Sequence, residues 1–222
     1  QAVARMARRP AGNIWARLAQ QQARWILRRA VSEGQKALRR APRTAAATAR
    51  KALVAGAHEH IGIGIAKGPA GLRRYRFFKP EGLPKGPLHP LIIMLHGCSQ
   101  SAADFAASTR MDRLATLNGF MVLYPEQDRL ANAQGCWNWF DTRSGRAQRE
   151  AASMVAALDH ACGLHAIDPG RVAIVGLSAG ASMAALVALH FPQRFAAVIM
   201  HSGVEPTLAH STATALSAMR AS

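Results

Sequence analysis

One serine in this sequence has the neighbours that a nucleophile needs. Ser178 stands in the pattern Gly-x-Ser-x-Gly, which runs from Gly176 to Gly180. The apolar run 172–175 before it is typical of a buried strand, and the residues after it have helical spacing. A serine on a tight turn between a strand and a helix stands clear of the sheet and can attack a carbonyl carbon. The pattern predicts a nucleophilic Ser178, against the alternative of an ordinary serine in a strand–helix connection.

Two backbone N–H groups are candidates for the oxyanion hole that such a nucleophile requires. The N–H of Ala179 lies at the predicted helix N-terminus, where the helix dipole favours negative charge. The second candidate is the N–H of Cys98, in the segment HGCSQ after the apolar run Leu91–Leu95. A loop after an early strand supplies this second donor in hydrolases with the Gly-x-Ser-x-Gly turn. We interpret His96 in this loop as a core histidine that supports the loop, and not as the catalytic base.

A sheet and helices must position these residues, and the hydrophobic pattern indicates where they lie. Short apolar runs predict strands, and apolar residues three and four positions apart predict helices. The predicted strands are Arg73–Lys79, Leu91–Leu95, Phe120–Tyr124, Arg171–Val175 and Phe195–Met200, with turns at residues 80–90 and 168–170. The predicted helices are Ala102–Leu117, Ala147–His165 and Ala179–Phe191, and residues 126–146 are predicted to form an irregular loop. Buried strands that alternate with helices predict an α/β fold with a mostly parallel sheet and helices on both faces.

Charge divides the chain into a basic extension and a nearly balanced remainder. Residues 1–52 hold 13 of the 28 Lys and Arg residues and one of the 12 acidic residues, so they carry +12 of the net charge of +16. Apolar residues near helical spacing predict a basic amphipathic helix there: Ile14, Trp15, Leu18, Trp25 and Ile26. A solvated extension, contact with an anionic surface or polymer granule, and nucleic-acid binding are the alternatives. No base-reading motif accompanies the charge, so no specific nucleic-acid partner is expected.

Composition excludes several classes for the chain as a whole. Half of its 222 residues are hydrophobic, which excludes a wholly disordered protein. No apolar run approaches the roughly 18 residues of a membrane-spanning helix, and three cysteines are too few for a disulfide scaffold. Residues 53–71, rich in glycine, are predicted to be a linker, and residues 72–222 are predicted to be the catalytic domain.

Six motifs in a fixed order carry a resemblance to a known family. The sequence resembles the poly(3-hydroxybutyrate) depolymerase family of esterases, which is also similar to feruloyl and acetylxylan esterases, over about residues 72–220. The motifs are His96–Gln100, Phe105–Leu114, Tyr124–Gln127, Gly135–Phe140, Gly176–Gly180 and His201–Gly203. The resemblance implies an α/β-hydrolase fold, Ser178 as the nucleophile and the backbone of Cys98 in the oxyanion hole. It also implies a secreted or periplasmic enzyme that acts on an ester polymer without a metal or cofactor.

Two features of the family motifs are left open at this point. Cys98 and Cys136 both lie in family motifs, and either a disulfide or two free thiols is compatible with the sequence. Cys162, in a predicted helix, is interpreted as a small buried hydrophobe. Trp137 and Trp139 form either a hydrophobic wall against the substrate or an anchor for their loop.

The partners that a catalytic serine needs are harder to find. In this fold the acid and then the histidine follow the serine in the chain. After Ser178 the chain holds one acidic residue, Glu205, and three histidines: His190, His201 and His210. None follows two further strands, so we expect a fold that is incomplete at its C-terminus, with the triad's Asp and His beyond Ser222. The predicted function is ester hydrolysis, and the favoured substrate is a short-chain polyhydroxyalkanoate. The alternatives are a feruloyl or acetylxylan esterase and a non-catalytic polymer-binding protein.

Overall fold

A computed structural model describes residues 60–206 together with residues 214 and 217. The predicted basic extension, the first part of the predicted linker and His210 lie outside these residues.

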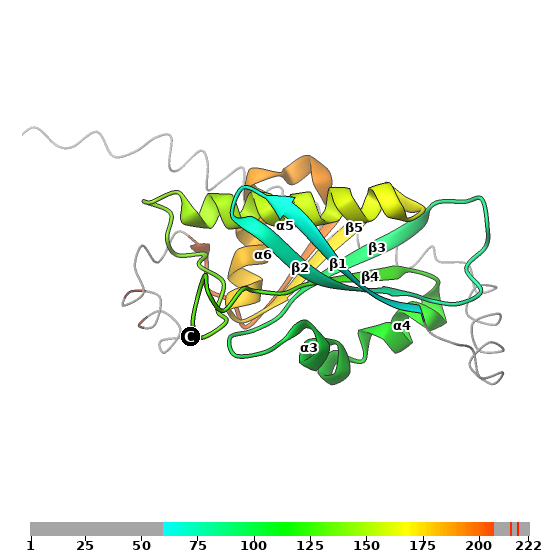
Figure 1. Cartoon of the computed structure of the whole chain (residues 1–222), viewed down its shortest axis with the longest axis horizontal. Coiled ribbons are helices and arrows are strands. Elements are labelled where there is room, and N and C mark those ends of the chain that lie inside the picture. The colour runs from blue at the N-terminus through cyan, green and yellow to red at the C-terminus, as the bar shows by residue number, and fades with distance from the viewer. Residues whose placement is uncertain (1–59, 207–213, 215–216, 218–222) are drawn as a thin grey trace, which may run out of the picture.

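A six-stranded mixed sheet forms the centre of the molecule (Figure 1). The strands are β1 (His60–Gly68), β2 (Gly71–Lys79), β3 (His89–Leu95), β4 (Met121–Pro125), β5 (Ile167–Leu177) and β6 (Ala197–His201). Their order across the sheet is β1-β2-β4-β3-β5-β6. Strands β3, β4, β5 and β6 are parallel, whereas β2 pairs antiparallel with both β1 and β4. The sheet is therefore mostly parallel, as predicted.

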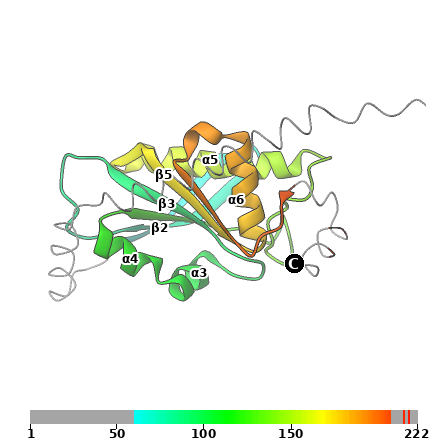
Figure 2. The same ribbon diagram turned by 180° about the vertical axis from the view of Figure 1, so that it is seen from behind.

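Helices cover both faces of this sheet. Figures 1 and 2 show α5 and α6 over one face and α3 and α4 over the other. Their bounds are α3 Ala102–Thr109, α4 Met111–Asn118, α5 Arg146–Leu164 and α6 Ala179–His190, with a short 3-10 turn η1 at Pro192–Arg194. None of these described helices combines the length and the apolar character needed to cross a membrane.

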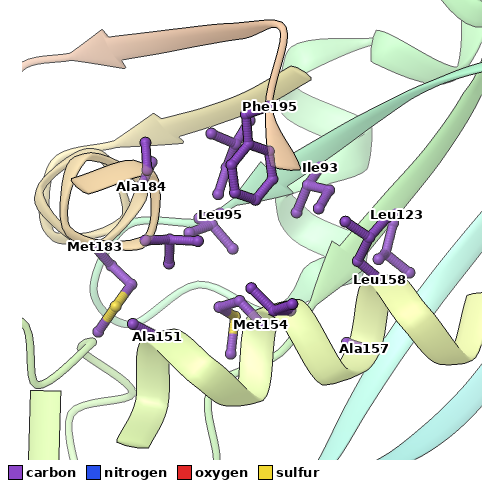
Figure 3. Packing of buried hydrophobic residues seen from close by; sticks show 14 of the residues in the cluster. Ile93, Leu95, Leu123, Ala151, Met154, Ala157, Leu158, Met183, Ala184 and Phe195 are labelled. Atoms are coloured by element: carbon purple, nitrogen blue, oxygen red, sulfur yellow. The ribbon is translucent and has the colours of Figure 1, made fainter. Parts of the chain in front are cut away.

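The core on the α5 and α6 side fixes the strands that lead to the predicted site. Figure 3 shows Met154 and Leu158 of α5 directed toward Ile93 and Leu95 of β3 and Leu123 of β4. All five side chains are almost fully buried. Burial of such a side chain contributes about 1.5–3 kcal/mol, so this packing holds β3 firmly in the sheet.

One predicted helix is two helices in the structure. The predicted helix Ala102–Leu117 is divided at Arg110, which has φ 52° and ends α3 before α4 begins. A left-handed residue interrupts the helical hydrogen bonds, and no glycine or proline signals this break. At the start of α3 the side chain of Ser101 accepts the Asp104 N–H, and the Asp104 carboxylate accepts the Ser101 N–H, which forms a capping box.

The linker prediction is wrong for residues 60–68. They form strand β1, which pairs with β2 over its whole length. A Cβ at Gly64 would lie 2.1 Å from the ring of Tyr75, and a Cβ at Gly68 would lie 2.6 Å from Ser153 Oγ. These glycines therefore permit close packing against β2 and α5, and they do not mark a flexible segment.

The predicted turn at residues 168–170 lies within strand β5. The ladder with β3 is irregular there, because His89 pairs with Ile167 while Leu91 pairs with Val172. The Asp168 carboxylate accepts the Gly170 N–H at 2.9 Å, as in an Asx turn. The turn is thus an interruption of the ladder rather than the end of a strand.

Candidate active site

Ser178 occupies a strained turn between β5 and α6. Its backbone has φ 55° and ψ −121°, a conformation that residues other than glycine rarely adopt. Its N–H donates to the His201 carbonyl at 2.8 Å, which ties the turn to the end of β6. A Cβ at Gly176 would lie 2.1 Å from the Gly180 carbonyl oxygen, so the two glycines of the motif meet across the turn. The local structure is that of a nucleophile elbow.

The loop after β3 lies against this turn. A Cβ at Gly180 would lie 2.2 Å from the Leu95 carbonyl oxygen and 2.5 Å from that of His96. Leu95 also pairs with Gly176, so β3 and β5 end together at the same edge of the sheet. The start of α6 and the segment HGCSQ are therefore in contact, as the two predicted oxyanion donors require.

Both predicted donor groups are unpaired among the described residues. The N–H groups on either side of Cys98 are occupied: Gly97 N–H donates to Gln100 Oε1 at 2.8 Å and Ser99 N–H donates to the Gln134 carbonyl at 2.9 Å. The N–H groups of Cys98 and Ala179 donate to no other described residue. Buried backbone N–H groups are almost always paired. Ala179 is 1% exposed and Cys98 is half-buried, so two unpaired N–H groups at this turn are unusual.

His96 supports the loop from within, in agreement with the interpretation of its sequence position. Its ring is buried, its Nδ1 lies 2.7 Å from the Gly97 carbonyl, and its Nε2 accepts the Gln127 N–H at 3.1 Å. These two contacts require the neutral ring with the proton on Nδ1. Burial lowers the pKa of His96, although the hydrogen bond to Gly97 acts in the opposite direction.

A disulfide joins Cys98 to Cys136 and so settles the alternative that the sequence left open. It connects the loop after β3 with the irregular loop between β4 and α5. Cys162 is a free, half-buried thiol that packs against the core, close to its predicted role.

The interpretation of Trp137 as part of a substrate wall is wrong. This side chain has no exposed surface, and its indole N–H donates to the His96 carbonyl at 2.8 Å. Trp139 is equally buried. The alternative holds for both: the tryptophans anchor their loop, and Trp137 anchors it to the segment that carries Cys98.

The structure brings none of the described histidines to the Ser178 side chain. His190 is exposed at the end of α6, and His201 is exposed at the end of β6. Among the described residues, no hydrogen bond joins the Ser178 hydroxyl to an imidazole or a carboxylate. The predicted nucleophile and the two predicted oxyanion donors come together here, and no described residue is placed to act as a base for Ser178.

A buried polar cluster under the loop was missed by sequence reasoning. It comprises Arg73, Gln127, Asn138 and Glu150, each at most 4% exposed. Gln127 and Asn138 lie within two of the motifs quoted above, which was the available signal. Arg73 in a basic strand and Glu150 in a polar helical turn carry no local signal.

Comparisons with known proteins agree with this geometry. A family model described as Esterase PHB depolymerase matches residues 74–222. Poly(3-hydroxyalkanoate) depolymerase C from Paucimonas lemoignei is 36% identical over 68% of this chain and 36% of its own length. Feruloyl esterase B from Neurospora crassa is 30% identical over 61% of this chain and 45% of its own length. An acetyl xylan esterase from Aspergillus awamori has a similar structure, with a TM-score of 0.57, 20% identity and coverage of 70% of this chain and 56% of that one.

Proposed function

We propose a function from one premise, that this chain belongs to the PHB depolymerase family of esterases. The proposed activity is hydrolysis of carboxylic esters through an acyl-enzyme on Ser178. The chain spans less than half the length of the two curated relatives above, so the activity is proposed for the protein that contains it.

The observation that carries this proposal is the strained serine beside two unpaired N–H groups. In the proposed reaction, Ser178 Oγ attacks the ester carbonyl carbon, and the carbonyl oxygen becomes an oxyanion. The N–H groups of Cys98 and Ala179 donate to that oxyanion, where they stabilise the transition state more than the ground state. The alcohol leaves, and water then releases the acid from the serine. A histidine outside the described residues takes the Ser178 proton and delivers it to the leaving alcohol.

Replacement of the nucleophile tests this function. Ser178→Ala should lower kcat for a soluble short-chain ester by at least about a thousandfold, because the covalent route is lost. Ser108→Ala is a matched control, since Ser108 is exposed on α3 and its hydroxyl donates to the Phe105 carbonyl of the same helix at 3.2 Å. Normal ester hydrolysis by folded Ser178→Ala protein would contradict the proposal.

The substrate that we propose is a short-chain polyhydroxyalkanoate. The supporting observation is the 36% identity to a protein named as a poly(3-hydroxyalkanoate) depolymerase. A feruloyl ester is the second candidate, because a feruloyl esterase is 30% identical. Turbidity loss of polyhydroxybutyrate suspensions and release of ferulate from methyl ferulate, measured side by side, distinguish the two.

Two further proposals concern where the protein acts. Export to an oxidising compartment is supported by the Cys98–Cys136 disulfide, since such bonds persist there. Contact of residues 1–52 with an anionic or polymer surface is supported by their net charge of +12. Sedimentation with anionic vesicles and with polymer granules should then require residues 1–52, and binding to vesicles should weaken in high salt.

A further inference from the structure

Two opposite charges are buried beneath the loop that carries Cys98. Arg73 of β2 is 2% exposed and Glu150 of α5 is 1% exposed. Such residues are almost never fully buried unless they are paired, because removal of a charge from water is costly. Burial lowers the pKa of Arg73, and attraction to the Glu150 carboxylate opposes that shift.

The side chain of Gln127 bridges the two charges. Its Oε1 accepts a hydrogen bond from the Arg73 guanidinium, and its Nε2 lies 3.1 Å from each carboxylate oxygen of Glu150. The same Nε2 lies 3.0 Å from the carbonyl oxygen of Cys136. The two charges fix the orientation of this amide, since a rotated amide would direct its NH2 at the cation and its oxygen at the anion.

Both segments that hold the Cys98 loop are bound to this cluster. On one side, the Gln127 N–H donates to His96, whose ring supports the Gly97 carbonyl. On the other side, the Glu150 carboxylate accepts the backbone N–H of Asn138 at 3.0 Å and also the side-chain NH2 of Asn138.

The segment that contains Asn138 is attached to the loop at two points. Cys136 forms the disulfide with Cys98, and the indole N–H of Trp137 donates to the His96 carbonyl. The Arg73 guanidinium lies 5.4 Å from the centre of the Trp137 ring, which is within the range of a cation–π contact. Among the described residues, the disulfide and the hydrogen bonds of His96 thus connect the loop to Arg73, Gln127 or Glu150.

We propose that Glu150 and Arg73 are positioning residues of the oxyanion hole, which act through Gln127 and the segment 136–138 to fix the Cys98 N–H. The inference rests on the proposed function. It identifies the residues that hold one of the two oxyanion donors, the Cys98 N–H, in place. A donor aids catalysis only when it already points at the position where charge will develop. Looser support should therefore lower kcat and leave KM nearly unchanged.

Glu150→Gln tests the proposal, because it removes the charge and keeps the size of the side chain. In the parent protein, Gln127 and Asn138 direct donors at both carboxylate oxygens of Glu150. The amide of the variant offers only one acceptor oxygen to these donors. We expect kcat to fall by about 10–100-fold with KM within about twofold, which is less than the loss of a whole oxyanion donor. Hydrogen exchange of the peptide covering residues 96–100, measured in the full chain, should become faster.

Asp112→Asn is a matched control on the opposite face of the sheet. Asp112 is a largely buried carboxylate that pairs with Arg76 at 2.7 Å, and Arg76 lies over the ring of Tyr124 at 5.2 Å. The pair resembles the Arg73–Glu150 cluster but makes no described contact with the Cys98 loop. Asp112→Asn should reduce stability while kcat and exchange of residues 96–100 remain as in the parent protein.

A double variant separates an effect on positioning from an effect on stability. It also tests the proposal if Glu150→Gln alone fails to fold. Removal of both buried charges in Arg73→Met/Glu150→Gln should restore much of the lost stability, because no uncompensated charge remains. We expect kcat to stay low in this variant. Recovery of kcat in step with stability would mean that the cluster only supports the fold, and would overturn the proposal.

The two proposals fail in different ways. If Ser178-dependent hydrolysis is present and Glu150→Gln leaves both kcat and loop exchange unchanged, the positioning role is wrong. If the protein that contains this chain hydrolyses no ester, the proposed function is wrong. Faster exchange of residues 96–100 in Glu150→Gln, but not in Asp112→Asn, would then still support the positioning role.

Discussion

At the scale of single residues, the strained backbone of Ser178 explains why glycines and a hydrogen bond to β6 surround it. A residue held in such a conformation costs about 1–3 kcal/mol, which the surrounding contacts must offset. Those contacts are the hydrogen bond to His201 and the close approach of Gly176 and Gly180. The glycine pattern therefore predicted the tight turn at Ser178, and the role of this residue as a nucleophile stays a prediction. Glu150 could not be found in the same way, because its buried carboxylate is paired with residues 12 and 23 positions away.

The neutral ring of His96 leads to a pH dependence at the same scale. Its lowered pKa means that below its ordinary value of about 6.5 the unfolded chain binds a proton that the folded chain resists. The unfolded state then holds more protons, so stability should be constant above about pH 7.5 and fall as the pH drops below 6.5. Urea unfolding between pH 5 and pH 8 measures this fall.

His165 is the control for that measurement, since burial lowers its pKa as well. The lowered carboxyl pKa values of Asp104 and Asp168 act in a window below about pH 4, outside the measured range. In His165→Gln a fall below pH 6.5 should remain. A flat profile in that variant would assign the whole effect to His165 and contradict the prediction for His96.

At the scale of elements, the disulfide fastens together two loops that lie 38 residues apart in sequence. Closure of such a loop in the unfolded chain contributes about 4 kcal/mol in the chain-entropy account. Cys98→Ser/Cys136→Ser should lower the free energy of unfolding by up to this amount, measured by urea unfolding at neutral pH. It should also lower kcat, because the Cys98 N–H loses one of its supports.

Cys162→Ser provides the comparison for that experiment. Cys162 is free and half-buried, so its replacement should change stability by no more than about 1 kcal/mol. Equal stability of the double serine variant and the parent protein would show that the disulfide does not constrain the fold.

The elements also show where sequence patterns succeed and fail. Continuous apolar runs predicted β3 and β4 because both strands are buried on both faces, a pattern that a single sequence displays directly. Strand β1 was missed because its inner face carries glycines that a turn would also use. The break at Arg110 was missed because it depends on how α3 and α4 pack on the sheet, which no local residue signals.

At the scale of the whole molecule, the hairpin β1–β2 belongs to the folded unit. It pairs over nine positions, and α5 packs against β1. A chain that begins at His60 should therefore unfold as cooperatively as the full chain. A chain that begins at Arg74 loses β1 and Arg73, and it should unfold at a clearly lower temperature or aggregate through the exposed edge of β2.

Thermal unfolding followed by circular dichroism compares the two shortened chains. Similar transitions would show that the hairpin is dispensable, contrary to the packing described above.

The position of Arg73 also predicts which residues should change together among members of the family. The segment shared with the family begins at residue 74, immediately after this arginine, while Glu150 lies inside it. A relative that kept the buried acid without a cation from its first hairpin would hold an uncompensated charge beneath the loop. In an alignment that includes the hairpin, the basic residue of β2 and the acidic residue of α5 should therefore be gained and lost together.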